Sequence, residues 1–159
     1  MTTGTNTRWR EALADAARQA LEQMVSMTPD SCEDLDATVR SVTADVVSVL
    51  GFAGNRSGLL TISCPRDLAW RVSAGMLFAD PSELEQEEVS DAMGEISNLV
   101  LGGFKNTWVE AGHDMQMSVP SVSIGIGPTV NLGANPVEAY ALGLQLGADQ
   151  LRIDLRFLK

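Results

Sequence analysis

The chain has 159 residues, a mass of 17.0 kDa and a hydrophobic fraction of 45%, which suit one domain with a single core. Its formal net charge of −10 and pI near 4.4, without a sizeable basic cluster, exclude nucleic acid and anionic membranes as main partners and favour partners that carry positive charge. With two cysteines, no CxxC spacing and one histidine, the sequence predicts neither a disulfide scaffold nor a metal site.

The N-terminal part predicts a flexible tail followed by a helix. Residues 1–6 are polar, and the apolar residues after them recur at helical spacing, which predicts an amphipathic helix over residues 7–27. An acidic loop is expected over residues 28–37. No segment has the ~18 uninterrupted apolar residues of a membrane span, and the N-terminus lacks the apolar core of a signal peptide, so a cytoplasmic location is expected.

A hairpin and a short helix are expected next. Valine and other β-branched residues dominate residues 39–52, a glycine-rich turn follows at residues 51–58, and residues 59–64 have strand composition; together they predict a β-hairpin. Pro65 suits a helix start, and the apolar spacing after it predicts a short helix that ends at Leu77.

The last third of the chain indicates strands. Residues 115–124 form an extended run, residues 133–136 have the composition of a loop, and residues 140–157 alternate in polarity on both sides of a turn, which predicts a hairpin with one buried face. The whole chain, residues 1–159, is therefore expected to be a single α+β domain. A largely antiparallel sheet would be covered by long amphipathic helices, in the order α-β-β-α-α-β-β-β.

The most informative element is a helix expected to begin near residue 81 and to pass through residue 105. The acidic run Glu83–Glu88 suits the positive end of the helix dipole, which explains it without a docking function. At about 100° per residue, the apolar residues gather on one side and are expected in the core: Val89, Ala92, Met93, Ile96, Val100, Gly103 and Phe104. The other side carries a polar wedge, made of Asp91, Glu95, Asn98, Gly102 and Lys105.

The polar wedge differs from an ordinary solvated helix face, which prefers long charged side chains. Gly94 and Gly102 each disfavour the helix by about 1 kcal/mol relative to Ala. We expect them to leave a low, flat surface where the backbone of a partner protein can approach, with Glu95 and Asn98 at its centre. The alternative is that Asp91, Glu95 and Asn98 form a solvated face without function.

The motif Asp91-x-x-x-Glu95-x-x-Asn98, on a helix behind the turn at residues 54–58 and ahead of Pro120 and three further strands, resembles the CheX branch of the CheC/CheX/FliY chemotaxis phosphatases. The similarity extends from the first helix to the end of the chain. A single copy of the motif points to CheX, because CheC resembles a duplicated form of such a domain, with two helices that carry the motif. Between Asn98 and Pro120 lie 21 residues, one fewer than in the family pattern, so the resemblance gives Pro120 no role.

The resemblance implies an enzyme that removes phosphate from the aspartyl phosphate of a CheY-like receiver domain in two-component signalling. It implies that the receiver supplies Mg²⁺ and a phosphate-contacting Lys, so this chain needs no cofactor of its own. Asn98 would hold the attacking water, and Glu95 would bind the Lys of the receiver. The partner-binding residues would be Asp91, Gly94, Gly102 and Lys105.

The resemblance also implies a homodimer, formed at an edge of the sheet within residues 115–158. Two alternatives to the phosphatase stay open: a module that binds receivers without hydrolysis, and a structural component of a flagellar switch or signalling assembly. The intact pair of Glu95 and Asn98 favours the phosphatase. His113 lies in a loop without a nucleophilic partner, and Gly125–Gly127 is not followed by a helix start, so neither motif predicts a site.

Overall fold

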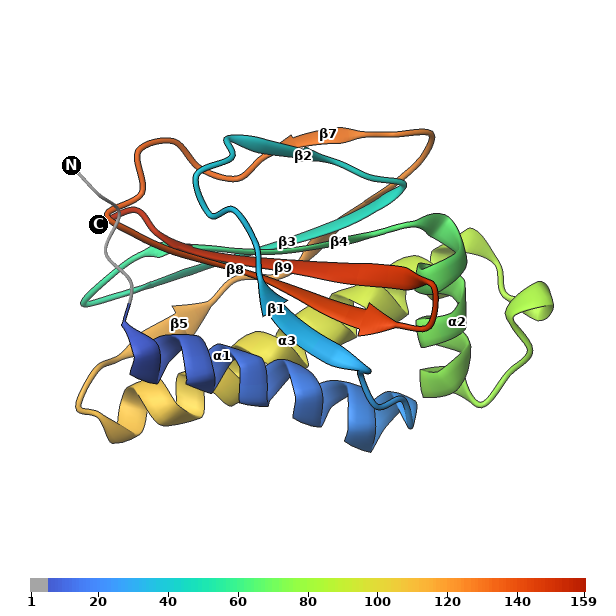
Figure 1. Cartoon of the computed structure of the whole chain (residues 1–159), viewed down its shortest axis with the longest axis horizontal. Coiled ribbons are helices and arrows are strands. Elements are labelled where there is room, and N and C mark those ends of the chain that lie inside the picture. The colour runs from blue at the N-terminus through green and yellow to red at the C-terminus, as the bar shows by residue number, and fades with distance from the viewer. Residues whose placement is uncertain (1–5) are drawn as a thin grey trace.

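A computed structural model describes residues 6–159, in which helices cover one face of an antiparallel sheet and a smaller sheet lies on the other side (Figure 1). Across the seven-stranded main sheet the order is β1 (Ser31–Asp34), β8 (Glu138–Leu146), β9 (Asp149–Phe157), β4 (Gly58–Cys64), β3 (Val46–Gly54) and β5 (Met115–Met117), with β6 (Ser121–Ile124) also paired to β3. The small sheet pairs β2 (Ser41–Thr43) with β7 (Thr129–Asn131). The expected α+β class with a largely antiparallel sheet is confirmed.

Two long helices lie side by side along the main sheet, and a third packs at one end (Figure 1). α1 (Thr7–Ala20), which continues as a π-helical turn (Leu21–Val25), lies beside α3 (Gln86–Glu110), and α2 (Arg66–Leu77) is the helix at the end. A Cβ at Gly103 would lie 2.9 Å from Cβ of Ala16, so this glycine allows α1 and α3 to approach closely. Within residues 6–159, no helix is both long enough and apolar enough to cross a membrane.

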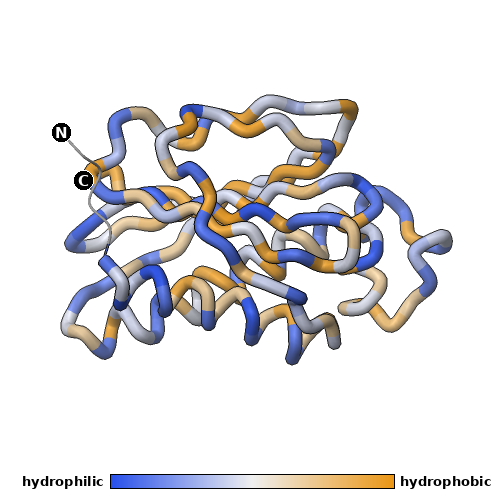
Figure 2. The backbone as a smooth tube through the Cα atoms, in the orientation of Figure 1, coloured by the Kyte–Doolittle hydropathy of each residue, from blue (hydrophilic) through white to orange (hydrophobic). Residues whose placement is uncertain are grey.

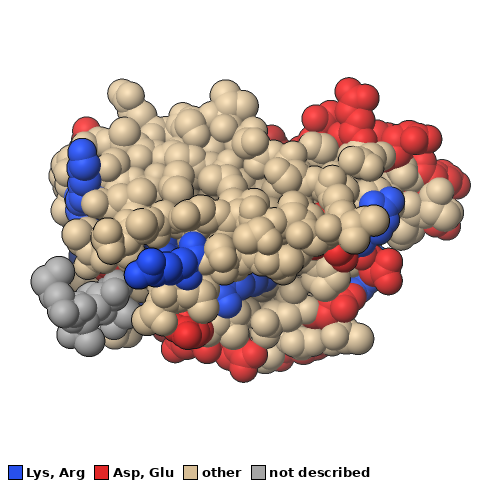
Figure 3. Space-filling model, turned by 90° about the horizontal axis from the view of Figure 1, so that it is seen from above, with Lys and Arg blue, Asp and Glu red and all other residues tan. Residues whose placement is uncertain are grey.

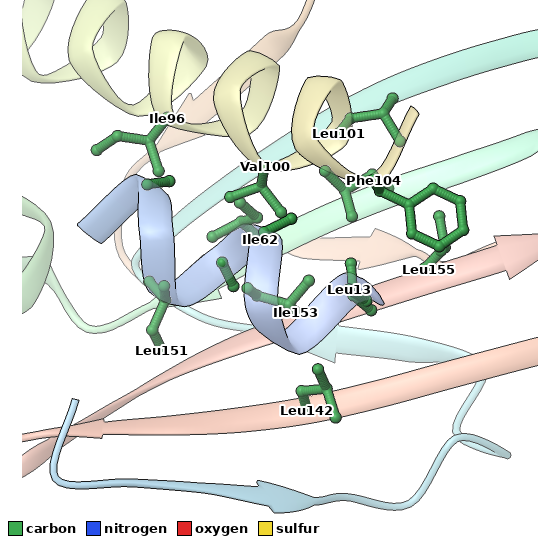
Figure 4. Packing of buried hydrophobic residues seen from close by; sticks show 14 of the residues in the cluster. Leu13, Ile62, Ile96, Val100, Leu101, Phe104, Leu142, Leu151, Ile153 and Leu155 are labelled. Carbon is green, nitrogen blue, oxygen red and sulfur yellow. The ribbon is translucent and has the colours of Figure 1, made fainter. Parts of the chain in front are cut away.

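The main core lies between the two long helices and the facing side of the sheet. Figure 4 shows apolar side chains of α1 and α3 that point toward those of the strands. Each labelled residue is at most 1% exposed: Leu13, Ile62, Ile96, Val100, Leu101, Phe104, Leu142, Leu151, Ile153 and Leu155. In Figure 2 the apolar stretches run through the middle of the molecule, and the outer turns of the helices are hydrophilic. Burial of the apolar face of each amphipathic helix holds the helices on the sheet.

A buried arginine links the main sheet to the segments around the small sheet. Arg156 of β9 is 2% exposed; its Nη1 donates to the carbonyl of Gly133 at 3.0 Å, and its Nη2 donates to the carbonyls of Ala37, at 2.9 Å, and Val39. These carbonyls lie in the segments that lead into β2 and out of β7. Burial lowers the pKa of Arg156, because the guanidinium loses water that stabilises its charge, and the three carbonyls replace part of that water.

The loop expected over residues 28–37 is wrong in its middle, because Ser31–Asp34 forms strand β1. β1 pairs antiparallel with β8, from Ser31 opposite Gln145 to Asp34 opposite Leu142. Its side chains are exposed or half-buried, so it lacks the alternation that marks a strand in the sequence. Backbone hydrogen bonds at the edge of the sheet hold it instead.

The start of the central helix also differs from the prediction. Asp80 caps a separate 3₁₀ turn (Pro81–Glu83), after which the backbone returns to an extended conformation. α3 begins only at Gln86, where a capping box between Glu85 and Glu88 satisfies the backbone N–H groups of these two residues. The expected helices over residues 7–27 and 65–77 agree with α1 with its π turn and with α2.

The tail expected at residues 1–6 falls outside the described residues, except for Asn6. Its side chain accepts a hydrogen bond from the backbone N–H of Arg8 at 2.9 Å and so caps α1. Its own backbone N–H donates to the hydroxyl of Tyr140 on β8 at 2.9 Å. Asn6 is thus part of the folded structure.

Candidate functional site

The polar wedge lies on the outer side of α3, as predicted. Asp91 and Glu95 are exposed, and Asn98, Gly102 and Lys105 are half-buried. The apolar side chains predicted to face the core are at most 3% exposed: Val89, Ala92, Met93, Ile96, Val100 and Phe104. The division of this helix into a core face and a free face is therefore confirmed.

Glu95 and Asn98 are presented by one turn of α3. Their i, i+3 spacing places them ~5–6 Å apart on the same side of the helix. Within residues 6–159, neither side chain forms a hydrogen bond or an ion pair with the rest of the chain. The exposed carboxylate and the half-buried amide can therefore bind a second protein without first breaking hydrogen bonds within residues 6–159.

A buried pair of hydroxyls fixes how α3 lies on the sheet. Ser97 Oγ donates to Ser48 Oγ of β3 at 2.7 Å, and both side chains are fully buried. Ser97 Oγ also lies 3.1 Å from the carbonyl of Met93, whereas Ser48 Oγ has no other hydrogen-bond partner in residues 6–159. Because a buried hydroxyl without a partner costs about 1–3 kcal/mol, the bond to Ser48 favours one rotation of the helix. Ser97 lies between Glu95 and Asn98 in the chain, so the bond orients the turn that presents them. Sequence reasoning missed this pair, because nothing in a single sequence connects Ser48 with Ser97.

Gly94 is not part of an open surface, contrary to the prediction. It is buried, and a Cβ at this position would lie 3.3 Å from Cγ of Pro120 and 3.7 Å from Cγ2 of Val122. The glycine allows the chain between β5 and β6 to approach α3, and this chain fills the space expected for a partner. Pro120 therefore packs beside the turn that carries Glu95 and Asn98.

Gly102 does leave open space, because a Cβ there would lie within 4 Å of no atom of residues 6–159 outside its own stretch of helix. Lys105, on the next turn, is the first basic residue after Arg71, and seven carboxylates lie between these two positions. Figure 3 shows acidic side chains gathered over the end of the molecule that holds α2 and the start of α3. Asp91 and Glu95 are two of these seven carboxylates, so the first part of the polar wedge is acidic and favours cations.

Other features of the described residues do not offer comparable chemistry. The ring of His113 stacks on Trp108 with centroids 4.1 Å apart, and its Nδ1 lies 2.9 Å from Nδ2 of Asn55, so it is a packing residue. A hollow of about 440 Å³ between the start of α1 and strands β1 and β8 contains no residue of α3. Within residues 6–159, no three His, Cys, Asp or Glu side chains are grouped so that they could hold a metal ion.

A family model described as chemotaxis phosphatase CheX matches residues 46–139, more than half of the chain, from the start of β3 into β8. The chain belongs to the CheX family. The region matched to CheX includes α3 with Glu95 and Asn98, and also the loop that carries Pro120. The resemblance seen in the sequence is thereby confirmed. No curated protein sequence matches the chain.

Solved CheX structures share the fold over nearly the whole chain. CheX of Desulfovibrio desulfuricans superposes with a TM-score of 0.81 at 19% identity, covering 94% of this chain and 99% of that one. CheX of Vibrio vulnificus gives 0.79 at 25% identity, with the same coverage of 94% and 99%. A complex of Borrelia burgdorferi CheX with CheY, BeF₃ and Mg²⁺ gives 0.75 at 19% identity, with 95% and 98% covered. The CheX fold therefore extends beyond the region that the family model matches.

Proposed function

We propose that this CheX-family protein hydrolyses the aspartyl phosphate of a CheY-like receiver domain, in chemotaxis or a related two-component pathway of the cytoplasm. The observation that carries the proposal is the pair of Glu95 and Asn98 on one turn of α3, the first exposed and the second half-buried, without a hydrogen-bond partner in residues 6–159, in a chain of this family. The complex of the B. burgdorferi relative with CheY supports a receiver as the partner.

Asn98 is proposed to hold the attacking water. Its side-chain carbonyl can accept one hydrogen of the water while its NH₂ group donates elsewhere, which keeps the water oxygen in line with the phosphorus of a docked receiver. A bond then forms between this oxygen and phosphorus as the bond from phosphorus to the aspartyl oxygen breaks. The products are inorganic phosphate, which takes up the oxygen of the water, and the free carboxylate of the receiver.

Glu95 is proposed to anchor the receiver through an ion pair with its phosphate-contacting Lys. The acidic surface around α3 would draw that Lys toward Glu95 during encounter. Asp91, Gly102 and Lys105 lie along the same side of the helix and are proposed to contact the receiver at the rim. Mg²⁺ bound by the receiver would neutralise charge on the phosphoryl group, and we propose that this chain adds no cofactor.

The test is the decay of phosphorylated receivers. Receiver domains of the same organism are charged with acetyl phosphate, and loss of phosphate is followed with and without this protein. Binding is measured separately, with beryllofluoride and Mg²⁺ in place of the phosphoryl group. Faster decay of at least one receiver supports the proposal. If every receiver that the protein binds decays at its intrinsic rate, hydrolysis is contradicted and a non-catalytic receiver-binding or flagellar-switch module takes its place.

The open surface at Gly102 gives a first prediction. Gly102→Leu should raise or maintain the melting temperature, because Leu favours a helix over Gly by roughly 0.8–1 kcal/mol and a Cβ at this position meets no neighbouring atom of residues 6–159. Its affinity for a beryllofluoride-activated receiver should fall, since the larger side chain meets the backbone of the partner. Thermal unfolding and titration of the same variant measure the two effects. Unchanged affinity would remove Gly102 from the interface.

We also propose that the protein is a homodimer. β5 and β6 both pair with β3 and lie at one edge of the main sheet, where backbone groups remain free for a second copy. β8 and β9 lie within the sheet, so within residues 115–158 the main sheet offers only β5 and β6 as edge strands. Light scattering at micromolar concentration should give twice the chain mass, and a value near 17.0 kDa would contradict the dimer.

A further inference from the structure

The short loop Ser118–Pro120, which joins β5 to β6, is held at both ends. At its start, the backbone N–H of Ser118 donates to the carbonyl of Gly51 on β3 at 2.8 Å, and Ser118 Oγ accepts from the N–H of Gly51 at 2.9 Å. At its end, Pro120 packs against Gly94 of α3. The loop is therefore fixed to both the sheet and the helix.

Val119 is the residue between these two anchors, and its side chain is 86% exposed. An exposed valine is ordinary by itself. Here, however, the neighbouring Pro120 touches Gly94, which directly precedes Glu95 and lies one turn from Asn98. The two anchors also keep the loop from turning this side chain back toward the core. Val119 is thus an exposed apolar group in a fixed loop, and the next residue of this loop packs beside the turn that carries Glu95 and Asn98.

We propose that Val119 forms an apolar contact with the receiver and helps to decide which receivers this protein accepts. The inference rests on the proposed function, because a receiver that brings its phosphoryl group to Asn98 must cover the surface beside Gly94. Since the loop is already fixed, burying Val119 requires little loss of conformational entropy.

The partner that fits this surface has two features side by side. One is the Lys that meets Glu95, and the other is an apolar side chain next to the phosphorylated aspartate. Glu95 and Asn98 bind groups that every receiver of this kind would carry. Val119 would instead contact a position that can differ between receivers, and a polar or charged residue there would be rejected because it would be buried without a partner.

The test compares Val119→Asp, Val119→Lys and Val119→Ala with Ile126→Asp as the matched control. Ile126 is fully exposed in the loop that leads from β6 into β7 of the small sheet. Val119→Asp and Val119→Lys should each raise Kd for the beryllofluoride-activated receiver, and KM for dephosphorylation, about tenfold to a hundredfold. Val119→Ala should have a smaller effect of the same sign. kcat at saturating receiver and all melting temperatures should stay unchanged, and Ile126→Asp should match the wild type.

Each other outcome overturns the inference in a distinguishable way. An unchanged Kd for both charged variants would show that the receiver does not cover Val119. A Kd raised by Asp but lowered by Lys would show an electrostatic effect in place of an apolar contact. A changed mass of Val119→Asp by light scattering, with receiver binding intact, would assign Val119 to a contact between two copies. If the wild-type protein neither binds nor dephosphorylates any receiver, the proposed function fails together with the inference.

Discussion

Asn98→Ala should lower the rate of receiver dephosphorylation on the order of 10²–10³-fold, about 3–4 kcal/mol in the barrier, while most of the affinity is retained. The physical reason is that the amide is proposed to contact the water that reacts, and this contact is worth most in the transition state. The side chain is half-buried and has no hydrogen bond within residues 6–159, so the fold does not depend on it. Single-turnover decay of a phosphorylated receiver at saturating protein measures the effect.

Substitutions of Glu95 should affect affinity as well as rate, which distinguishes its proposed role from that of Asn98. Glu95→Ala should weaken binding of the activated receiver as well as slow its decay, because the anchor for the Lys is lost. Glu95→Gln should restore the shape of the side chain but not the ion pair. Asp91→Ala, one turn toward the start of α3, should have less effect than either. Equal losses of affinity in Asn98→Ala and Glu95→Ala would contradict the separate roles of water holding and anchoring.

Arg156→Ala should lower the free energy of unfolding by about 3 kcal/mol or more. The guanidinium is buried, and its removal leaves the carbonyls of Gly133, Ala37 and Val39 without their donor, each at about 1 kcal/mol or more. Urea unfolding followed by tryptophan fluorescence measures the loss. Arg156→Lys should recover only part of it, because an ammonium group cannot span three acceptors as the planar guanidinium does.

The matched control for Arg156 is Arg40, which lies near the same segment but is exposed. Arg40→Ala should change the free energy of unfolding by less than about 0.5 kcal/mol. Amide exchange should also become faster around β2 and β7 in Arg156→Ala, before any change in the main sheet. A loss of stability equal to that of Arg40→Ala would show that the three carbonyls find water when the arginine is removed.

Elements whose apolar residues recur at regular spacing could be predicted from the sequence. A strand that is held only by backbone pairing could not. The hairpin of β8 and β9 and the helices α1 and α3 each bury an apolar face, so their spacing is visible in the residues. The expectation of one buried face for the hairpin is wrong, because Asp154 and Arg156 on the other face are also buried, under the segments around the small sheet. β1 has no such face and exists because its backbone pairs with β8. The start of α3 was misplaced because Asp80 and Pro81 form a valid cap, but for a separate turn.

The candidate site could also be predicted only in part from the sequence. Glu95 and Asn98 could be located on the free face of α3 from helical geometry alone. The glycines could not be told apart, because the sequence shows that each disfavours a helix but not what approaches it. The structure places Pro120 against Gly94 and leaves Gly102 open. The bond between Ser48 and Ser97 joins residues 49 positions apart, and a single sequence does not reveal such a pair.

The position of Glu95 and Asn98 on the outside of a helix, with Glu95 freely exposed, has a consequence for turnover. If the chain hydrolyses the aspartyl phosphate as proposed, a receiver that covers these side chains would also seal the reacting water inside the joint surface, so the phosphate formed could leave only as the two proteins separate. Dissociation then becomes part of the catalytic cycle. A variant that binds the receiver more tightly would release phosphate more slowly and so slow the cycle. The fastest dephosphorylation of the receiver would therefore be expected at an intermediate affinity.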